Sequence, residues 1–490
     1  MSGSARDVFE HLLWANPPDA PESRFGTACV IGGSIAGLLA ARVLADYARR
    51  VVVIERNEVA GNDSVSSGVP HGQQVHVLLP AGLVRIERLL PGFAEEAYAL
   101  GAVPAAPERA SLYFDTHPCL QTRHEPLMLA TRPFLEARIR ARVLALPNVV
   151  IKRGRAVGFD SHKGAVSGVR YMVDDAENLL ETDFAIDAMG RGSQLSAWLE
   201  QAGFDRPPLQ RLPSGINYAT ALFDRVRDDE PSWATTLVQH SPGRGPRGIA
   251  LSVTSAVESG RWIVMLMAHH PVKPPRTVEE FRELCAHMPH PFPEAVGGAL
   301  VREIVTYHQR DSRRRDFAGP LNLPARLVSV GDAVAAFNPA FGQGMSSAAL
   351  HSSCLNEYLR AGPDLDLPAR EFFDLQQVVV DAAWQVSAGS DAARLDALDN
   401  AEVPEEVRRQ RWALEQITTA TVTDQHVAQA FRDVTFMLDH PDRLADPTLL
   451  ERAVTANRAN AAEQNRSDIA GGAAPCYEFA NPCPRHRCTH

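Results

Sequence analysis

The chain has 490 residues, of which 45% are hydrophobic, 22% are charged and 7% are aromatic. This composition is typical of a globular protein with room for two or three domains, and it excludes a disordered or fibrous chain. The formal net charge of -10 argues against a nucleic acid or an anionic membrane as the main partner, because such partners favour basic surfaces.

Residues 1–24 are expected to form an N-terminal arm. They lack the basic start and the continuous apolar core of a secretory signal, so we expect a cytoplasmic protein. Phe9, Leu12, Leu13 and Trp14 offer apolar side chains for packing on the body, but a partly ordered extension is the simpler expectation. No run of apolar residues is long enough for a membrane-spanning helix.

The next stretch predicts a strand, a helix and a second strand. The apolar strand Cys29–Ile31 leads into a glycine turn, a helix runs from about Ile35 to Tyr47, and Val51–Ile54 form the second strand. The turn reads Gly-Gly-Ser-Ile-Ala-Gly from residue 32 to 37, which is a dinucleotide fingerprint with Ser34 in the middle-glycine position. This pattern predicts a nucleotide site.

Each part of the fingerprint has a physical task. Gly32 permits the tight turn and Gly37 lets the helix and the strand pack closely, while the free NH groups and the dipole of the helix N-terminus attract a pyrophosphate. Glu55 ends the second strand, where a carboxylate accepts hydrogen bonds from ribose hydroxyls.

The middle of the chain alternates between helices and strands. Helical patterns run through Leu90 and again from Arg132 to Leu146, and residues 149–173 alternate like a strand pair with a glycine turn. A further apolar strand ends at Asp187 and is followed by glycines and a helix. Residues 211–305 then read as an inserted sheet without a nucleotide signal.

The last third begins with a strand that ends at Gly331-Asp332, and a helix starts from about Gly344. Helical patterns with apolar faces follow from Pro363 to about Asn460. The tail from 471 to 490 is expected to be flexible. Its cysteines and histidines match no closed zinc pattern, so we expect no metal site; they are Cys476, Cys483, His486, Cys488 and His490.

The three strand-turn-helix units at 32–37, 187–193 and 331–345 are more than one nucleotide fingerprint needs. The middle unit, "DAMGRGS", and the late unit, "GDAVAAFNPAFGQGM", resemble the motifs of the FAD-dependent single-component (class A) aromatic-hydroxylase group. The late unit departs from that group at Ala335, where a histidine is usual.

The resemblance implies a set of FAD contacts. Arg132 reaches the phosphate and ribityl side, Asp332 accepts a hydrogen bond from a ribityl hydroxyl, and Pro339 lies near the flavin edge where oxygen reacts. Backbone NH groups at residues 342–345 face the ring and stabilise negative charge on the reduced flavin. The full expected set is Gly32, Gly33, Ser34, Gly37, Glu55, Arg56, Arg132, Asp187, Gly331, Asp332, Pro339, Gly342, Gly344 and Met345.

The implied fold is α/β. A Rossmann-like FAD-binding domain of the glutathione-reductase type, formed by residues 25–210 and 306–360, is interleaved with a sheet-based substrate domain at 211–305. C-terminal helices follow at 361–470. No acid–base dyad is expected, because a flavin hydroperoxide carries the oxygen-transfer chemistry and the protein excludes water and orients the substrate.

A closer likeness is to the polyether polyene epoxidases of the lasalocid and monensin type. It lies in "SGVPHGQQVHVLLPAGLVRIERLLPG", "GINYATALF", "GRWIVML" and "VVVDAAWQVSAGSD". The group's usual G-V-P-Q-x-R-H-x-H reads Gly-Val-Pro-His-Gly-Gln-Gln-Val-His here, from residue 68 to 76. His76, Tyr218, Trp262 and Met265 are candidates for the substrate pocket, and core packing is the alternative role for each.

The resemblance implies a monooxygenase that uses NAD(P)H as a transient reductant and O₂ to epoxidise or hydroxylate a hydrophobic polyketide-like or terpenoid-like molecule. A flavin-dependent halogenase is disfavoured, because none of the tryptophans has the W-x-W spacing normal in that group. An isoprenoid double-bond reductase and a flavin carrier without turnover stay open.

Overall fold

The structure is a computed structural model that describes residues 3–20, 22–57, 72–226, 231–319 and 321–471. The tail cysteines and histidines named above, and residues 67–71 of the epoxidase-like segment, lie outside these ranges. Within the described ranges, no helix is both long and apolar enough to cross a membrane.

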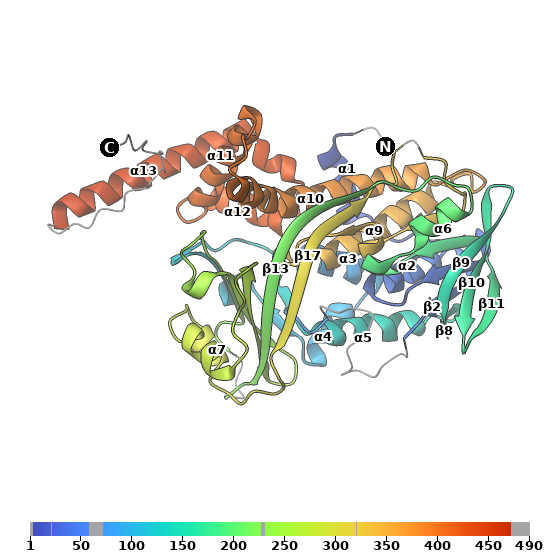
Figure 1. Cartoon of the computed structure of the whole chain (residues 1–490), viewed down its shortest axis with the longest axis horizontal. Coiled ribbons are helices and arrows are strands. Elements are labelled where there is room, and N and C mark those ends of the chain that lie inside the picture. Colours follow the sequence, from blue (N-terminus) through green and yellow to red (C-terminus); the bar gives the residue numbers. More distant parts are fainter. Residues whose placement is uncertain (1–2, 21, 58–71, 227–230, 320, 472–490) are drawn as a thin grey trace, which may run out of the picture.

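One of the two large sheets is a five-stranded parallel sheet, of which β2 and β8 are labelled in Figure 1. The strand runs are apolar because both faces of such a sheet are covered. Helices α2 (Ile35–Leu44) and α5 (Arg132–Leu144) pack on it, and α9 (Gly344–Arg360) packs on α2. In sheet order the strands are β18 (Leu327–Ser329), β12 (Phe184–Asp187), β1 (Phe25–Ile31), β2 (Ala48–Glu55) and β8 (Val149–Arg153).

A small antiparallel sheet contacts β2 and β12, and α6 packs nearby on one of its strands. It contains β9 (Arg155–His162), β10 (Ala165–Val173) and β11 (Ala176–Glu181), and α6 spans Leu195–Gln201. Another short sheet, in the order β3-β7-β4, lies beside α3 (Pro80–Leu89) and α4 (Phe93–Ala99). Its strands are β3 (Val77–Leu78), β4 (Val103–Ala105) and β7 (Leu127–Leu129).

The second large element is an eight-stranded sheet with the order β19-β17-β13-β16-β15-β14-β5-β6. It includes the region expected at 211–305 and also takes strands from residues 110–118 and beyond 305. The two long strands β13 and β17 run side by side through the molecule (Figure 1). The strands are β5 (Ala110–Phe114), β6 (His117–Pro118), β13 (Leu209–Asp224), β14 (Thr235–Gln239), β15 (Ile249–Val257), β16 (Arg261–His269), β17 (Val305–Arg315) and β19 (Ala335–Ala336).

Strand alternation gives this sheet two different faces. One face, the Trp262 face, carries Trp262, Val264 and Leu266 and packs with buried residues of α7 (Val278–Cys285) and α8 (Phe292–Ala295). The opposite face, the Tyr218 face, is a separate apolar cluster. It contains Ile216, Tyr218, Leu251, Val253, Met265 and Met267.

The C-terminal third is helical, as the sequence predicts. Helix α10 (Arg370–Asp399) packs on α9, and α11 (Glu405–Ala420), α12 (Gln425–Thr435) and α13 (Pro447–Gly471) pack on one another. Helix α13 extends away from the body in Figure 1. With helices on a parallel sheet and a second sheet-based layer, the predicted α/β class is confirmed.

The N-terminal arm contains a docked helix, α1 (Ala5–Trp14), which contacts α3, α9 and α10. Ser4 and Asp7 form a capping box at its start. Phe9, Leu12 and Leu13 are buried, whereas Trp14 stays half-exposed with the Arg88 guanidinium over its ring. The expectation of a partly ordered extension therefore does not describe this helix.

Arg85 fastens the end of α1 to α3. Its guanidinium is fully buried and donates to the carbonyl oxygens of Leu13, at 3.2 Å, and of Ala15. Burial lowers the pKa of Arg85 to about 10, so the side chain stays charged at neutral pH.

We expect Arg85→Met to lower the free energy of unfolding by about 2–4 kcal/mol, because two buried carbonyls lose their donor. Urea unfolding measures the loss, and limited proteolysis reports whether α1 detaches. Arg88→Met removes a more exposed arginine of the same helix and is expected to cost less than about 1 kcal/mol. Equal losses for the two variants would contradict this role of Arg85.

Candidate functional site

The three predicted motif turns meet at one edge of the parallel sheet. Ile31 pairs with Asp187 in register, and Asp187 pairs with Ser329, so β1, β12 and β18 end side by side. The turns that follow these strands therefore lie next to one another. In open α/β sheets, ligands bind at this carboxyl edge where the connections diverge to the two sides.

Glycines at this edge are required by close packing. Gly32 has a φ of +110°, and a Cβ there would lie 2.3 Å from the carbonyl oxygen of Ala188. A Cβ on Gly37 would lie 1.9 Å from the carbonyl oxygen of Gly32, and one on Gly331 would lie 2.5 Å from the Cβ of Ala36. These positions lock the first turn against the middle and late ones.

Glu55 and Ser34 belong to a hydrogen-bonded network around the first turn. Glu55 Oε2 accepts from the backbone NH of Gly33 at 2.7 Å, and Oε1 accepts from the NH of Asn57 at 2.9 Å. Ser34 Oγ donates to Glu136 Oε2 at 2.6 Å and accepts from Arg132 Nη2 at 3.3 Å. Arg56, by contrast, is exposed next to this network.

Sequence reasoning missed two members of this network, Glu136 and Arg140 on α5. Arg140 Nη2 donates to Glu136 Oε1 at 2.6 Å and to the carbonyl oxygen of Gly33 at 3.2 Å. Their i,i+4 spacing is a signal present in the sequence, but it is also typical of any solvated helix face. Only the burial of Glu136 beside the turn shows that this pair belongs to the site and not to a solvated helix face.

The carboxylate of Asp187 forms its hydrogen bonds with other groups of the protein. Its buried carboxylate accepts from Ser193 Oγ at 2.6 Å, from the NH of Met189 at 3.0 Å and from Ser329 Oγ at 3.1 Å. Burial raises the pKa of Asp187, and these three hydrogen bonds oppose the rise. Its carboxylate thus ties the middle turn to strand β18.

Asp332 lies half-buried at the start of the late motif. Burial raises its pKa, and the charges of Arg132 and Arg191 lower it. Arg191, which the sequence analysis did not single out, is in the middle motif and donates to the carbonyl oxygen of Asp311 at 2.7 Å. The late motif, the middle motif and the start of α5 therefore contribute one carboxylate and two guanidinium groups that interact electrostatically.

The late loop leads into the N-terminus of α9 and keeps an open surface. Pro339 and Gly344 are exposed, Gly342 has a φ of +68°, and a Cβ on Gly344 would meet nothing within 4 Å. Met345 is buried behind the loop. Gln343 is 1% exposed, yet neither end of its side-chain amide has a hydrogen-bond partner among the described residues.

This loop fits a flavin ring. A planar ring system with carbonyl oxygens and ring nitrogens matches free backbone NH groups at a helix N-terminus and an amide that can both donate and accept. The arginines and the first turn fit the phosphates of the same cofactor. These residues are the ones that would hold FAD.

His351, also missed from the sequence, supports the late turn from behind. The backbone NH of Gly331 donates to its Nδ1 at 2.9 Å, and the ring is fully buried. Burial lowers the pKa of His351 to about 3, so the imidazole stays neutral and keeps Nδ1 as an acceptor.

Asp391 on α10 supports the late loop from the other side. Asn338 Nδ2 donates to both carboxylate oxygens, at 3.2 Å and 3.1 Å, while Asn338 Oδ1 accepts from the NH of Ala340 at 3.0 Å. Asp391 is 2% exposed, and burial raises its pKa to about 6.

Because this pKa is raised above the ordinary value of 3.8, the folded state holds the proton more tightly than the unfolded state does. The stability that results is complete below pH 3.8 and is lost as the pH rises to about 6. We expect wild type to lose up to about 3 kcal/mol relative to Asp391→Asn over this range. Urea unfolding of both proteins at several pH values measures the difference, and a constant difference would contradict the raised pKa.

The substrate candidates divide between the two faces of the large sheet. Tyr218 and Met265 lie on the Tyr218 face, against which Ala340 of the late loop packs. The structure places Trp262 on the opposite face, because it is three residues from Met265 on β16 and side chains alternate along a strand. His76 is half-buried and its Nδ1 lies 2.9 Å from the carbonyl oxygen of Gln74.

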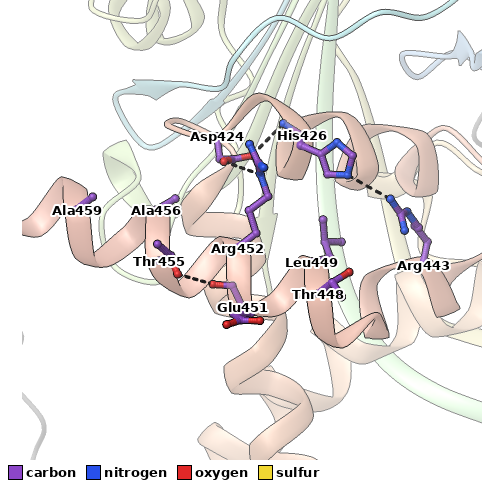
Figure 2. Close-up of a pocket in the computed structure, with 10 residues that line it drawn as sticks. All are labelled: Asp424, His426, Arg443, Thr448, Leu449, Glu451, Arg452, Thr455, Ala456 and Ala459. Atoms are coloured by element: carbon purple, nitrogen blue, oxygen red, sulfur yellow. Dashed lines mark hydrogen bonds and ion pairs between the residues drawn. The ribbon is translucent and has the colours of Figure 1, made fainter.

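A pocket of about 600 Å³ lies on the C-terminal helices, away from these motifs (Figure 2). It is lined mainly by residues of α13 and the start of α12. Its arginines already have partners: Arg452 pairs with Asp424 at 2.8 Å, and Arg443 pairs with Asp446 at 2.9 Å. This pocket contains none of the motif residues.

The comparisons agree with this geometry. Residues 26–361 match the family described as FAD binding domain. The chain is similar to Protein Rv3254 of Mycobacterium tuberculosis (strain ATCC 25618 / H37Rv), with 32% identity over 353 residues, covering 68% of this chain and 73% of that protein.

Two of the solved structures that share the fold are enzymes. One is the flavin-dependent brominase Bmp2, with 14% identity, a TM-score of 0.58 and coverage of 90% of this chain and 99% of that chain. The other is p-nitrophenol 4-monooxygenase PnpA from Pseudomonas putida DLL-E4, with 17% identity, a TM-score of 0.56 and coverage of 87% and 98%. The family match includes all three motif turns, whereas at these identities the solved structures show only the fold. The chain belongs to the FAD binding domain family, with FAD as its cofactor and a fold shared with flavin-dependent monooxygenases.

Proposed function

We propose that the protein is an FAD-dependent monooxygenase that uses NAD(P)H and O₂ to oxidise a hydrophobic small molecule. FAD would lie across the carboxyl edge of the parallel sheet, with its ADP part at residues 32–37 and Glu55 and its ring at residues 339–345. Residues 25–210 and 306–360 would hold the cofactor. Residues 211–305 would provide most of the substrate region.

One observation carries this proposal. Ala340, in the loop expected to hold the ring, packs against the Tyr218 face of the large sheet, where two methionines and several aliphatic side chains gather. An apolar substrate on this face would lie beside the flavin edge at Pro339. The sheet and the loop thus bring a candidate substrate surface to a candidate oxidising group.

The tasks of the protein in such a reaction are binding, orientation and exclusion of water. Reduced FAD, when bound, supplies the activation of O₂. Backbone NH groups at the start of α9 would stabilise negative charge on the ring, and the α9 dipole acts in the same direction. The apolar Tyr218 face would keep water from the reacting atoms.

We further propose that the reaction is epoxidation of an alkene in a polyketide-like or terpenoid-like molecule, with ring hydroxylation as the nearest alternative. The epoxidase-like segments support this choice, since "GINYATALF" and "GRWIVML" form the adjacent strands β13 and β16. Both strands contribute side chains to the Tyr218 face.

Halogenation is the second candidate, because the brominase Bmp2 shares the fold. Two features of this chain argue against it. No tryptophan pair has W-x-W spacing, and the three lysines of the chain, Lys152, Lys163 and Lys273, all lie outside the motif turns. Lys163 and Lys273 are exposed. A halogenase of this fold normally needs a lysine close to the flavin.

The experiment that tests the proposal uses purified protein reconstituted with FAD and supplied with NADPH or NADH, an alkene substrate and ¹⁸O₂. We expect a yellow protein and one labelled oxygen atom in the product. Product formed equally well without O₂ would favour a double-bond reductase, and incorporation of bromide or chloride would favour a halogenase. A protein that cannot be loaded with FAD would overturn the proposal.

A further inference from the structure

Two of the buried polar groups at the Tyr218 face that lack hydrogen-bond partners among the described residues bear on ligand binding. They are the hydroxyl of Tyr218, which is 3% exposed, and the side-chain Nε2 of Gln74, which is 5% exposed. A polar group buried without a partner destabilises the folded protein. Such groups call for an explanation, and a ligand that satisfies them is one.

Both groups lie on the same side of the sheet. Tyr218 and Thr220 are two residues apart on β13, so their side chains point to the same face. Thr220 Oγ1 donates to Gln74 Oε1, which fixes the orientation of the amide and leaves Nε2 as a free donor. Val75, the next residue, packs against the apolar cluster that contains Tyr218.

The position of Tyr218 is next to the proposed flavin loop. Its ring stacks on Tyr307 with centroids 6.3 Å apart, and Ala340 packs against the same cluster. The charge of Asp391, which binds Asn338 of the late loop, acts on the Tyr218 hydroxyl. A molecule that meets this hydroxyl therefore also lies near the loop.

The surroundings define the chemistry of the missing partner. Met265, Met267 and Leu251 form an apolar environment, so most of the molecule must be apolar. Both free groups can donate a hydrogen bond, so an oxygen acceptor satisfies them. The nearby carboxylate of Asp391 disfavours an anion. A neutral carbonyl, ether or hydroxyl oxygen meets all three conditions.

We propose that Tyr218 and Gln74 bind a neutral oxygen atom of an otherwise apolar substrate and thereby set its position against the flavin. This inference rests on the proposed function and narrows its substrate class to oxygenated hydrocarbons. The two residues are recognition groups, and the chemistry remains that of the flavin.

The binding test compares two ligands of the same skeleton with FAD-loaded protein. Benzalacetone carries a ketone oxygen beside its alkene, and 1-phenyl-1-butene lacks this oxygen. Changes in flavin absorbance measure both affinities. We expect the ketone to bind about tenfold more tightly than the hydrocarbon to wild type, and Tyr218→Phe to remove most of this difference by weakening ketone binding alone.

Gln74→Glu is the second variant. It keeps an acceptor for Thr220 and removes the Nε2 donor, so we expect it to weaken ketone binding as well. If both variants preserve the ketone preference, or if the wild type binds the two ligands equally, the proposal is overturned.

A ligand-free measurement tests the same idea independently of the substrate and of activity. Tyr47 is a matched control, since its buried hydroxyl lies 3.2 Å from Asn356 Oδ1 as a donor. We expect Tyr47→Phe to lower the Tm, and Tyr218→Phe to leave it unchanged or raise it. A Tm for Tyr218→Phe that falls as far as that for Tyr47→Phe would show that the Tyr218 hydroxyl is already satisfied, and the recognition role would be wrong.

The experiments distinguish a failure of this inference from a failure of the proposed function. Protein that binds FAD and oxygenates a substrate, but shows no ketone preference, overturns only the recognition pair. Protein that cannot bind FAD overturns the proposed function, while the Tm comparison still decides whether the Tyr218 hydroxyl lacks a partner.

Discussion

Gly37→Val is expected to give a protein that retains no FAD and has a much lower free energy of unfolding. A Cβ at this position would lie 1.9 Å from the carbonyl oxygen of Gly32, a contact that helix α2 can relieve only by moving away from the first turn. That movement separates the helix N-terminus from the place where the pyrophosphate would bind. We expect a loss of at least about 4 kcal/mol.

The ratio of flavin to protein absorbance measures retained FAD, and urea unfolding of the variant measures the stability loss. Gly389→Ala on α10 is the matched control, because Gly389 is exposed and its Cβ would meet nothing within 4 Å. This control is expected to keep its FAD and to gain about 0.5–1 kcal/mol from better helix propensity. A Gly37→Val protein that purified with full FAD content would contradict the requirement for glycine at this position.

Gly344→Val is expected to weaken FAD binding by about 10- to 100-fold while leaving the Tm of the apoprotein unchanged. The structure leaves space around this position, since a Cβ there would meet no protein atom within 4 Å. If the flavin ring lies against the start of α9, the new side chain pushes it away from the backbone NH groups. Loss of one or two charge-assisted hydrogen bonds accounts for an effect of this size.

Two measurements on the same variant separate a ligand role from a structural one. FAD titration by fluorescence quenching gives the Kd, and thermal unfolding of apoprotein gives the Tm, with Gly389→Ala again as the control. A Tm that falls together with the affinity would assign Gly344 to the fold. An unchanged Kd would mean that the ring does not lie at this loop.

The sequence predicts the first strand-turn-helix unit in type and order, with element ends within about four residues, because its signals are local. The expected strand at 29–31, helix at 35–47 and strand at 51–54 correspond to β1, α2 and β2 at 25–31, 35–44 and 48–55. Apolar runs and glycines report on neighbours in the chain, and these elements depend mainly on such neighbours. The α/β class and the C-terminal helices were predictable for the same reason.

The supporting residues of the site were not predictable, because their partners are distant in the chain. His351 contacts Gly331 across 20 positions, and Asp391 contacts Asn338 across 53. Asp187 shows the reverse case: its motif suggests a direct cofactor contact, yet its carboxylate binds Ser193, Met189 and Ser329. A motif places a residue at a site without stating which atoms it touches.

The sequence also did not predict which face of the sheet each strand residue occupies. Trp262 and Met265 are three positions apart on β16, so one must point away from the other's face, and both faces of this sheet are apolar. Where both faces are apolar, alternation does not show which one meets the flavin. Helices α7 and α8 pack on the Trp262 face, and this leaves the Tyr218 face as the one that we propose meets the flavin.

The strand order of the parallel sheet also constrains how the protein is made. Strand β18 is an edge strand, and it pairs with β12, which lies about 140 residues earlier in the chain. A ribosome must therefore synthesise the whole of the large sheet up to β17, and then β18, before the three motif turns can meet. Contacts between such distant segments form slowly. A nascent chain released at residue 326 would contain the first two motifs and most of both sheets, and it would still lack the strand that brings the third motif turn to the other two.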